Sequence, residues 1–289
     1  NETYAKFYPD PAIDSQGYAK VEMKNTSSSW CQDFFYLGPN YWRAGVSSAT
    51  YYKDAYLQPS PYNALPFLLY GQLSTQIIKP DATQNYTKDM QVILEGKVID
   101  DCGKEITDAD VIFRLQNGNY VVDVAVSYDA LQGAYYRAYT MPSDAPLGWY
   151  NVTMISSKQY YWNGTSTRVN AFFLASIPVF NATSVSPQAD GWGKSPFNFT
   201  VNVTNFDGTL TTVYFWLRKP SGEYELNATQ TCTNCLNTHM LFQRNFSKLD
   251  IGTWYYKFNA SSVSGFANET GTDWISFVVE KDDISLQNE

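Results

Sequence analysis

The chain has few of the residues on which most hydrolytic chemistry depends. Only one of its 289 residues is a histidine, His239, and histidine is the usual proton shuttle of serine, cysteine and zinc hydrolases. The sequence contains no G-x-S-x-G elbow, no H-E-x-x-H motif and no glycine-rich phosphate loop. Its 28 acidic residues leave a hydrolase built on two carboxylates as an open alternative. We expect a protein without enzymatic activity.

Positive charge and long apolar runs are also scarce. The chain carries 20 Lys and Arg against 28 Asp and Glu, which gives a net charge of −8 and a pI near 4.7. Such a chain repels a phosphate backbone. The longest apolar stretch, from Ala171 to Phe180, is interrupted by Ser176 and Pro178 and falls short of the roughly 20 residues that a membrane helix needs. We expect neither nucleic-acid binding nor a membrane span in these residues.

Glycosylation acceptor sequences, Asn-x-Ser/Thr, are abundant. They include twelve of the 21 asparagines, whereas the Ser and Thr content alone would give about three or four. The chain also begins with Asn and shows no apolar leader, as expected of a processed or excised extracellular segment. We predict heavy N-glycosylation outside the cell, at Asn1, Asn25, Asn85, Asn151, Asn163, Asn181, Asn198, Asn202, Asn227, Asn245, Asn259 and Asn268.

The four cysteines form an even set, which favours disulfides in an extracellular chain. Three pairings are possible. We favour Cys232 with Cys235, which lie close enough to close a tight turn. That leaves Cys31 and Cys102 as a long-range bond worth about 4 kcal/mol by loop entropy. A redox or zinc role for the Cys-x-x-Cys pair is the alternative, but His239 is the only histidine available as a ligand.

Alternating apolar and polar residues predict β-strands from about residue 91 onward. In Phe197–Thr204, Phe and Val share one face while Asn198 and Asn202 share the other. In Trp254–Asn259 the same alternation places the aromatic residues 254, 256 and 258 inward and Asn259 outward. The acceptor asparagines therefore fall where a glycan can be tolerated.

An internal repeat of just over one hundred residues, the size of one β-sandwich, divides most of the chain. Residues 111–115 (VIFRL) align with 213–217 (VYFWL), and residues 146–152 (PLGWYNV) align with 250–256 (DIGTWYY). Turns at Cys102-Gly103 and Asp207-Gly208 precede the two copies of the first motif. The copies span about residues 77–178 and 179–281.

These motifs resemble those of immunoglobulin-like modules of cell-surface proteins. Residues 249–255 (LDIGTWY) are similar to the corner that opens a late strand in that family, with Trp254 where Tyr is usual. Residues 145–150 (APLGWY) are similar to the version found in macroglobulin-like and in bacterial or archaeal surface repeats. With the dense acceptor sites, the acidity and the abundant Tyr, the pair resembles archaeal surface-layer or surface-filament ectodomains. The resemblance implies an all-β fold of tandem immunoglobulin-like β-sandwiches.

The flanking segments have a different character. Residues 1–76 are rich in Pro and aromatic residues and predict an irregular N-terminal domain or arm, which a Cys31–Cys102 bond would hold against the first sandwich. Residues 282–289 are expected to be a linker or tail.

Two kinds of ligand site are conceivable. Calcium prefers carboxylate oxygens, so Asp100, Asp101, Asp108 and Asp110 are candidate ligands, although solvated turn residues are the simpler interpretation and no other cofactor is expected. Trp42 and Trp192 lie beside Gly- or Asn-containing loops and are candidate contacts for a glycan, although packing inside the fold explains them as well.

The sequence therefore predicts a non-enzymatic, heavily N-glycosylated structural protein of the cell surface. Its partners would be copies of itself or other surface proteins, assembled into a layer or filament. The alternative is a glycan-binding or adhesion module, or an accessory region of a larger secreted enzyme.

Overall fold

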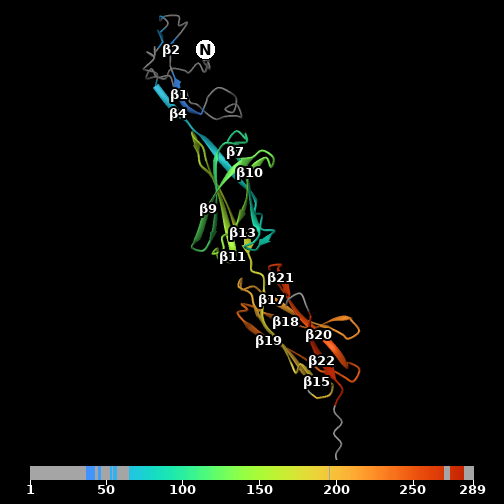
Figure 1. Cartoon of the computed structure of the whole chain (residues 1–289). Helices are drawn as coiled ribbons and strands as arrows, with labels where there is room; N and C mark the ends of the chain where they lie inside the picture. The colour runs from blue at the N-terminus through green and yellow to red at the C-terminus, as the bar shows by residue number, and fades with distance from the viewer. Residues whose placement is uncertain are drawn as a thin grey trace, which may run out of the picture.

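The computed structural model describes residues 37–42, 45–46, 53, 55–56, 65–194, 196–269 and 274–282. The regular structure within these residues is all β, as the sequence predicted. They contain no helix of the length and apolarity that crossing a bilayer would require. Two β-sandwiches lie end to end along the molecule (Figure 1).

The first sandwich begins with β5, and its strands join in the order β12-β5-β7-β10-β9-β8-β11-β13-β6. The strand β9 belongs to both layers, because it pairs with β8 along its length and with β10 at its end. The nine strands are β5 (Gly71–Lys79), β6 (Asn85–Tyr86), β7 (Gln91–Asp100), β8 (Asp110–Asn117), β9 (Tyr120–Asp129), β10 (Ala134–Thr140), β11 (Gly148–Ser157), β12 (Tyr161–Trp162) and β13 (Gly164–Leu174).

The second sandwich has a three-stranded layer, β14-β16-β19, and a layer in the order β15-β22-β20-β17-β18, with β21 also paired to β20. Its strands are β14 (Val179–Ser186), β15 (Ala189–Gly191), β16 (Phe197–Thr204), β17 (Thr211–Arg218), β18 (Tyr224–Cys232), β19 (Thr238–Arg244), β20 (Gly252–Ser262), β21 (Ala267–Glu269) and β22 (Ile275–Glu280).

The described part of the N-terminal region contains two short antiparallel ladders. The strand β1 (Gly38–Trp42) pairs with β4 (Leu65–Leu69), and β2 (Gly45–Val46) pairs with β3 (Ala55–Tyr56). A single residue, Tyr70, separates β4 from β5. The strand β5 begins at Gly71, six residues before the domain boundary at residue 77 that the repeat predicts. Leu73 of β5 is buried in the first sandwich, so this strand belongs to that sandwich.

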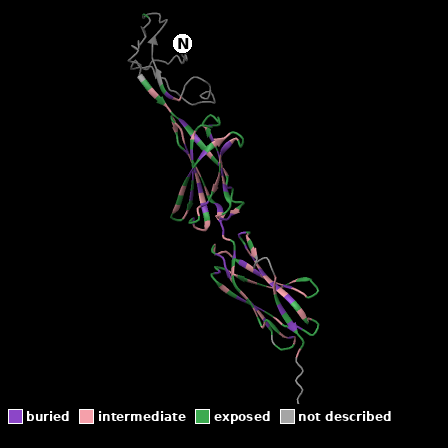
Figure 2. Cartoon of the chain, viewed as in Figure 1, coloured by how far each residue is buried: buried purple, intermediate pink, exposed green. Residues whose placement is uncertain are grey.

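Each sandwich has its own core, and strand alternation accounts for both (Figure 2). On β16 the side chains of Phe197, Phe199, Val201 and Val203 are buried, while Asn198 and Asn202 are not. On β20, Trp254, Tyr256 and Phe258 are buried and Asn259 lies on the outer side. The inward and outward faces predicted from the sequence are confirmed for these two strands.

The internal repeat is a structural repeat with a common register. In the first sandwich Val152 of β11 lies opposite Leu115 of β8, and in the second Tyr256 of β20 lies opposite Leu217 of β17. The sequence alignment pairs these same residues. In each copy the first long strand is followed by a short strand that pairs in parallel with the last strand, β6 with β13 and β15 with β22.

The corner motif has the same hydrogen bond in both copies although its aromatic residue differs. The Tyr150 hydroxyl donates to the carbonyl oxygen of Pro146 at 2.8 Å, and Trp254 Nε1 donates to that of Asp250 at 2.7 Å. Both bonds reach back four residues, and both rings are buried. Trp254 therefore replaces Tyr without loss of the bond, because an indole N–H can serve as the donor in place of a phenol.

Candidate functional site

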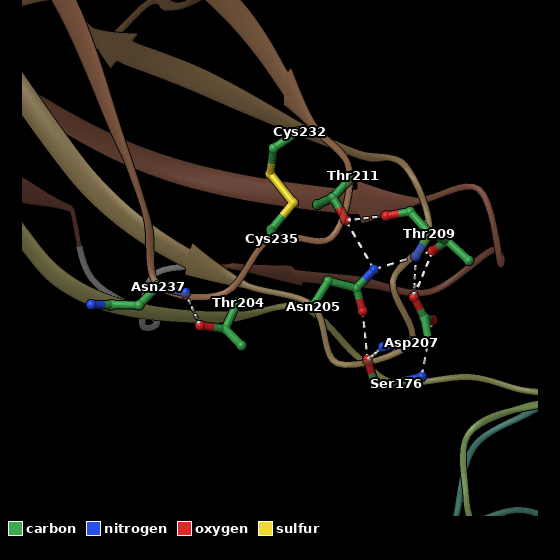
Figure 3. Close-up of a disulfide and its surroundings, with 9 residues drawn as sticks. All are labelled: Ser176, Thr204, Asn205, Asp207, Thr209, Thr211, Cys232, Cys235 and Asn237. Carbon is green, nitrogen blue, oxygen red and sulfur yellow. Dashed lines mark hydrogen bonds between the residues drawn. A yellow bond between two sulfur atoms is a disulfide. The ribbon is translucent and has the colours of Figure 1, made fainter.

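The joint between the two sandwiches is a compact polar site. Residues 175–178 connect β13 to β14, and Ser176 in this linker faces the β16–β17 turn of the second sandwich (Figure 3). The Ser176 hydroxyl donates to Asn205 Oδ1 and accepts the backbone N–H of Asp207 at 3.1 Å. The Ser176 backbone N–H donates to Asp207 Oδ2 at 3.1 Å. The linker is thus bound by three hydrogen bonds at one residue.

The Asp207 carboxylate organises the turn that receives the linker. Its Oδ1 accepts the backbone N–H and the hydroxyl of Thr209 at 2.9 and 2.6 Å, and its Oδ2 also accepts the Ser264 hydroxyl at 3.2 Å. An aspartate that bonds the backbone two residues ahead stabilises a turn. One carboxylate therefore fixes the turn and contacts both the linker and the β20–β21 turn.

Asn205 connects this turn to the disulfide. Its side chain is 1% exposed, and its Nδ2 donates to the hydroxyls of Thr209 and Thr211 at 3.2 and 2.9 Å. Its backbone N–H donates to the carbonyl of Cys235 at 2.8 Å. Because a buried amide without partners would be costly, this full set of bonds holds the Asn205 side chain in one orientation, with Oδ1 toward Ser176.

Cys232 and Cys235 form a disulfide beside this network, in agreement with the pairing favoured from the sequence. It closes the turn between β18 and β19, and Asn237 at the end of the turn donates its backbone N–H to Thr204 Oγ1 at 2.9 Å. Two bonds thus tie the cross-linked turn to residues 204 and 205, and Figure 3 shows the one between Asn237 and Thr204. The disulfide supports the surface on which the linker rests.

Two further hydrogen bonds stabilise the joint, and both come from predicted glycosylation sites. Asn85 Nδ2, at the start of β6, donates to the carbonyl of Ser264 at 2.9 Å. Asn268 Nδ2, in β21, donates to the carbonyl of Pro178 at 2.8 Å. The atom that would carry a glycan is therefore engaged in the joint at these two positions.

The corresponding turn of the first sandwich contains Cys102. Gly103 N donates to Asp100 O at 2.9 Å, and Gly208 N donates to Asn205 O at 3.4 Å, with both glycines at positive φ. This equivalence places Cys102 at the turn position of Asp207. Cys102 is disulfide-bonded, while the expected partner Cys31 lies outside the described residues.

The described acceptor asparagines are all on the surface. Asn85, Asn151, Asn163, Asn181, Asn198, Asn202, Asn227, Asn245, Asn259 and Asn268 are each exposed or partly exposed. Asn1 and Asn25 lie outside the described residues. Sterically, the fold leaves room for glycans on many sides, and glycosylation itself remains a prediction.

The four predicted calcium ligands do not meet. Among the described residues, the one group with metal-ligand spacing contains Asp100, Asp101 and Cys102, the last in a disulfide. Asp100 Oδ1 accepts the backbone N–H groups of Cys102 and Lys104 at 2.9 and 2.8 Å. A hydrogen bond from Lys158 lowers the pKa of Asp108. These contacts fit the simpler interpretation of turn residues.

The two tryptophans proposed as ligand contacts are differently placed. Trp192 is partly buried and packs against the core of the second sandwich, so packing accounts for it. Trp42 is the last residue of β1, and its side chain lies outside what the structure describes. His239 is exposed on β19, with its Nδ1 3.0 Å from Asn202 Oδ1.

No sequence pattern marks Ser176 or Asn205 as joint residues. Ser176 interrupts an apolar run, and Asn205 is one of the asparagines outside an acceptor sequence. The repeat did mark the turn at Asp207-Gly208. The sequence signs that do point to the joint are a polar residue, Ser176, close to the boundary between the two repeats, and a polar turn at Asp207, the position equivalent to Cys102.

No protein-family model and no curated protein matches the chain. Solved structures that resemble it include a marsupial T cell receptor, at 8% identity and TM-score 0.41 over 74% of this chain and 75% of that one. Alpha-2-macroglobulin from E. coli matches at 13% identity and TM-score 0.27 over 72% of this chain. Latent PorU from Porphyromonas gingivalis matches at 11% identity and TM-score 0.27 over 71% of it. The chain spans only 14% and 20% of these last two.

Proposed function

We propose that the chain is a non-enzymatic, N-glycosylated structural protein of an archaeal-type cell surface, in which the two sandwiches form a stiff spacer within a layer or filament. The observation that carries this proposal is the joint. Four hydrogen bonds hold the linker against the second sandwich, three at Ser176 and one at Pro178, and a fifth, from Asn85 to Ser264, joins the two sandwiches directly. A flexible tether between independent domains would need none of them.

The sheet faces support the same proposal. The outer face of the three-stranded layer carries acceptor asparagines on two neighbouring strands, with Asn181 of β14 opposite Asn202 of β16. Glycans there, together with the net charge of −8, would keep that face hydrated. Subunit contacts then fall to the ends of the molecule.

The test is negative-stain electron microscopy of the purified glycoprotein, with and without millimolar calcium. Ordered sheets or filaments are the expected result. Monodisperse particles in every condition would count against assembly. Release of the Ser176 contact by Ser176→Pro, which also removes the backbone donor, should make any such assembly less regular.

A glycan-binding or adhesion module is the second candidate, and one cluster favours it. Trp162 is 63% exposed, and its ring lies 5.5 Å from that of Tyr70, which is 45% exposed. Exposed aromatic rings can stack on sugars. This function predicts soluble monomers whose tryptophan fluorescence is quenched by a specific glycan, and Trp162→Ala should abolish the quenching.

A further inference from the structure

The outer face of the larger sheet in the second sandwich is rich in aromatic and cationic side chains. Arg218 of β17 lies opposite Tyr224 of β18 and Tyr255 of β20, and Trp216 lies opposite Lys257. Trp216, Arg218, Tyr255 and Lys257 are partly exposed, and Tyr224 is 60% exposed. On the opposite face of the same sandwich, the outward residues of β16 and β19 include Asn198, Thr200, Asn202 and Gln243. Five aromatic side chains thus gather on this face: Tyr214, Trp216, Tyr224, Tyr255 and Trp274.

The cations and rings of this face are packed together. The Arg218 guanidinium lies 4.1 Å from the ring centre of Tyr255 and 6.0 Å from that of Trp274. Lys257 Nζ lies 5.0 Å from the Trp274 ring centre, and the Tyr224 ring lies 5.1 Å from it. Such contacts hold side chains in place before any ligand arrives. Trp274 is the centre of the group.

An acceptor asparagine stands within this face. Asn259 is the next outward-facing residue after Lys257 on β20 and lies opposite Tyr214. Trp216 Nε1 donates to Asn259 Oδ1 at 2.6 Å. The indole thereby fixes the amide plane, and the Nδ2 atom that would carry a glycan is held beside the rings.

We propose that this face is a binding site for the first sugars of an N-glycan attached to Asn259, with Trp216 and Trp274 as stacking surfaces and Arg218 and Lys257 as hydrogen-bond donors. The apolar C–H faces of a pyranose ring suit the negative face of an aromatic ring. The cations donate to sugar hydroxyl or carboxylate oxygens. The proposal rests on the glycosylation in the proposed function.

The attached glycan is favoured over a free ligand because it is tethered. A group linked to the site has a high effective concentration, so contacts that are individually weak suffice to hold it. A bound glycan would also cover the apolar area that the rings leave partly exposed. A separate polysaccharide or a second copy of the chain are the other occupants, and the experiment distinguishes them.

The experiment uses the full chain from a glycosylating host, with site occupancy measured by mass spectrometry. Ser261→Ala removes the acceptor sequence and keeps Asn259, whereas the matched control Ser261→Thr preserves both. Ser261 also contacts the Tyr214 hydroxyl at 3.2 Å, so the same variants from a host that does not glycosylate measure the loss of that contact alone. We expect Ser261→Ala to lower the Tm by about 3 °C more in the glycosylated protein.

A double-mutant cycle assigns the effect to the face. In a Trp274→Ala background, the additional fall in Tm that Ser261→Ala causes in the glycosylated protein should disappear. Hydroxyl-radical footprinting of Trp274 in the wild-type protein needs no variant and should show at least a twofold lower reactivity when Asn259 is glycosylated.

Each outcome is decisive for one proposal. Occupied Asn259 with unchanged Trp274 reactivity would overturn the glycan site and leave the proposed function intact. An unoccupied Asn259 among occupied neighbours would also overturn it, and binding of an added polysaccharide or self-association blocked by Trp274→Ala would then identify the occupant. If no acceptor site is occupied, the glycosylation in the proposed function fails.

Discussion

Replacing Asp207 with Ala should loosen the joint between the sandwiches. The change removes the acceptor of the Ser176 N–H at 3.1 Å and the two bonds at 2.9 and 2.6 Å that shape the turn at Thr209. It also removes the acceptor of the Ser264 hydroxyl. Four hydrogen bonds to one carboxylate are lost together, and one of them holds the linker to the second sandwich.

The magnitude follows from the partial exposure of this carboxylate. A hydrogen bond to a charged group contributes roughly 1.5–3 kcal/mol, but water can replace an exposed acceptor, and this reduces the loss. Asp207 is partly exposed, so we expect the joint to lose about 2 kcal/mol. That loss raises the ratio of open to closed joints about 30-fold.

Pulsed electron paramagnetic resonance between two spin labels measures this change. Val121 in the first sandwich and Leu249 in the second are 50% and 87% exposed and suit the labels. The distance distribution should broaden in Asp207→Ala. Asp129→Ala is the matched control, because Asp129 Oδ1 accepts the Leu131 N–H at 2.8 Å in a turn away from the joint. Equal widths in the wild type and Asp207→Ala would refute the account of the joint.

Three further predictions concern the disulfide, the core and the acceptor sites. Replacing both Cys232 and Cys235 with Ser should lower the free energy of unfolding by about 2 kcal/mol through loop entropy. It should also broaden the same spin-label distances, because the turn that the disulfide closes supports Asn205. Sharp distances together with a lowered Tm would limit the disulfide to a local role. Burial raises the pKa of Tyr256 to about 12 from its ordinary value of 10.0, so the stability from keeping it neutral is complete below pH 10 and is lost as the pH rises toward 12. Tyr256→Phe should therefore resist alkaline unfolding by about 2–3 kcal/mol relative to the wild type at pH 12, with Tyr224→Phe, an exposed position, as the control in a denaturant titration at each pH. Glycopeptide mass spectrometry of protein glycosylated after folding should find Asn85 and Asn268 less occupied than Asn163 or Asn245. The reason is that the Nδ2 atoms of Asn85 and Asn268 donate to backbone carbonyls in the joint. Equal occupancy would mean that these bonds do not protect the acceptor nitrogen.

The alternation of apolar residues was sufficient to predict much of this fold. Strands such as β16 and β20 have one buried face and one solvent face, and a period of two specifies that arrangement locally. The repeat then located equivalent strands, because both copies bury the same pattern in the same register. These features depend on neighbours in sequence or on a simple offset, so one chain was enough to find them.

The joint could not be predicted in the same way. Ser176 and Asp207 are separated by 31 residues, and Asn85 and Ser264 by 179, and no local period relates residues at such distances. The repeat predicts a first sandwich from about residue 77, whereas β5 begins at Gly71; β5 has fewer apolar residues than β7, so its alternation is a weaker signal. The four candidate calcium ligands do not form one group, because proximity in sequence does not by itself bring side chains to one centre. Asp100 and Asp101 lie together, whereas Asp108 pairs with Lys158.

The two copies use the same turn position in different ways. In the second sandwich the Asp207 position binds the preceding linker through hydrogen bonds, and in the first sandwich the same position is a disulfide-bonded cysteine, Cys102. A carboxylate bond to a linker exchanges with water and can open, whereas a disulfide cannot open without reduction. If the joint carries load along a surface assembly, the disulfide at Cys102 should withstand a force that breaks the hydrogen bonds between Asp207 and the linker. In single-molecule pulling along the chain, the joint between the sandwiches should therefore extend before the segment that the Cys102 disulfide holds. After reduction of the disulfides, the joint should no longer extend first.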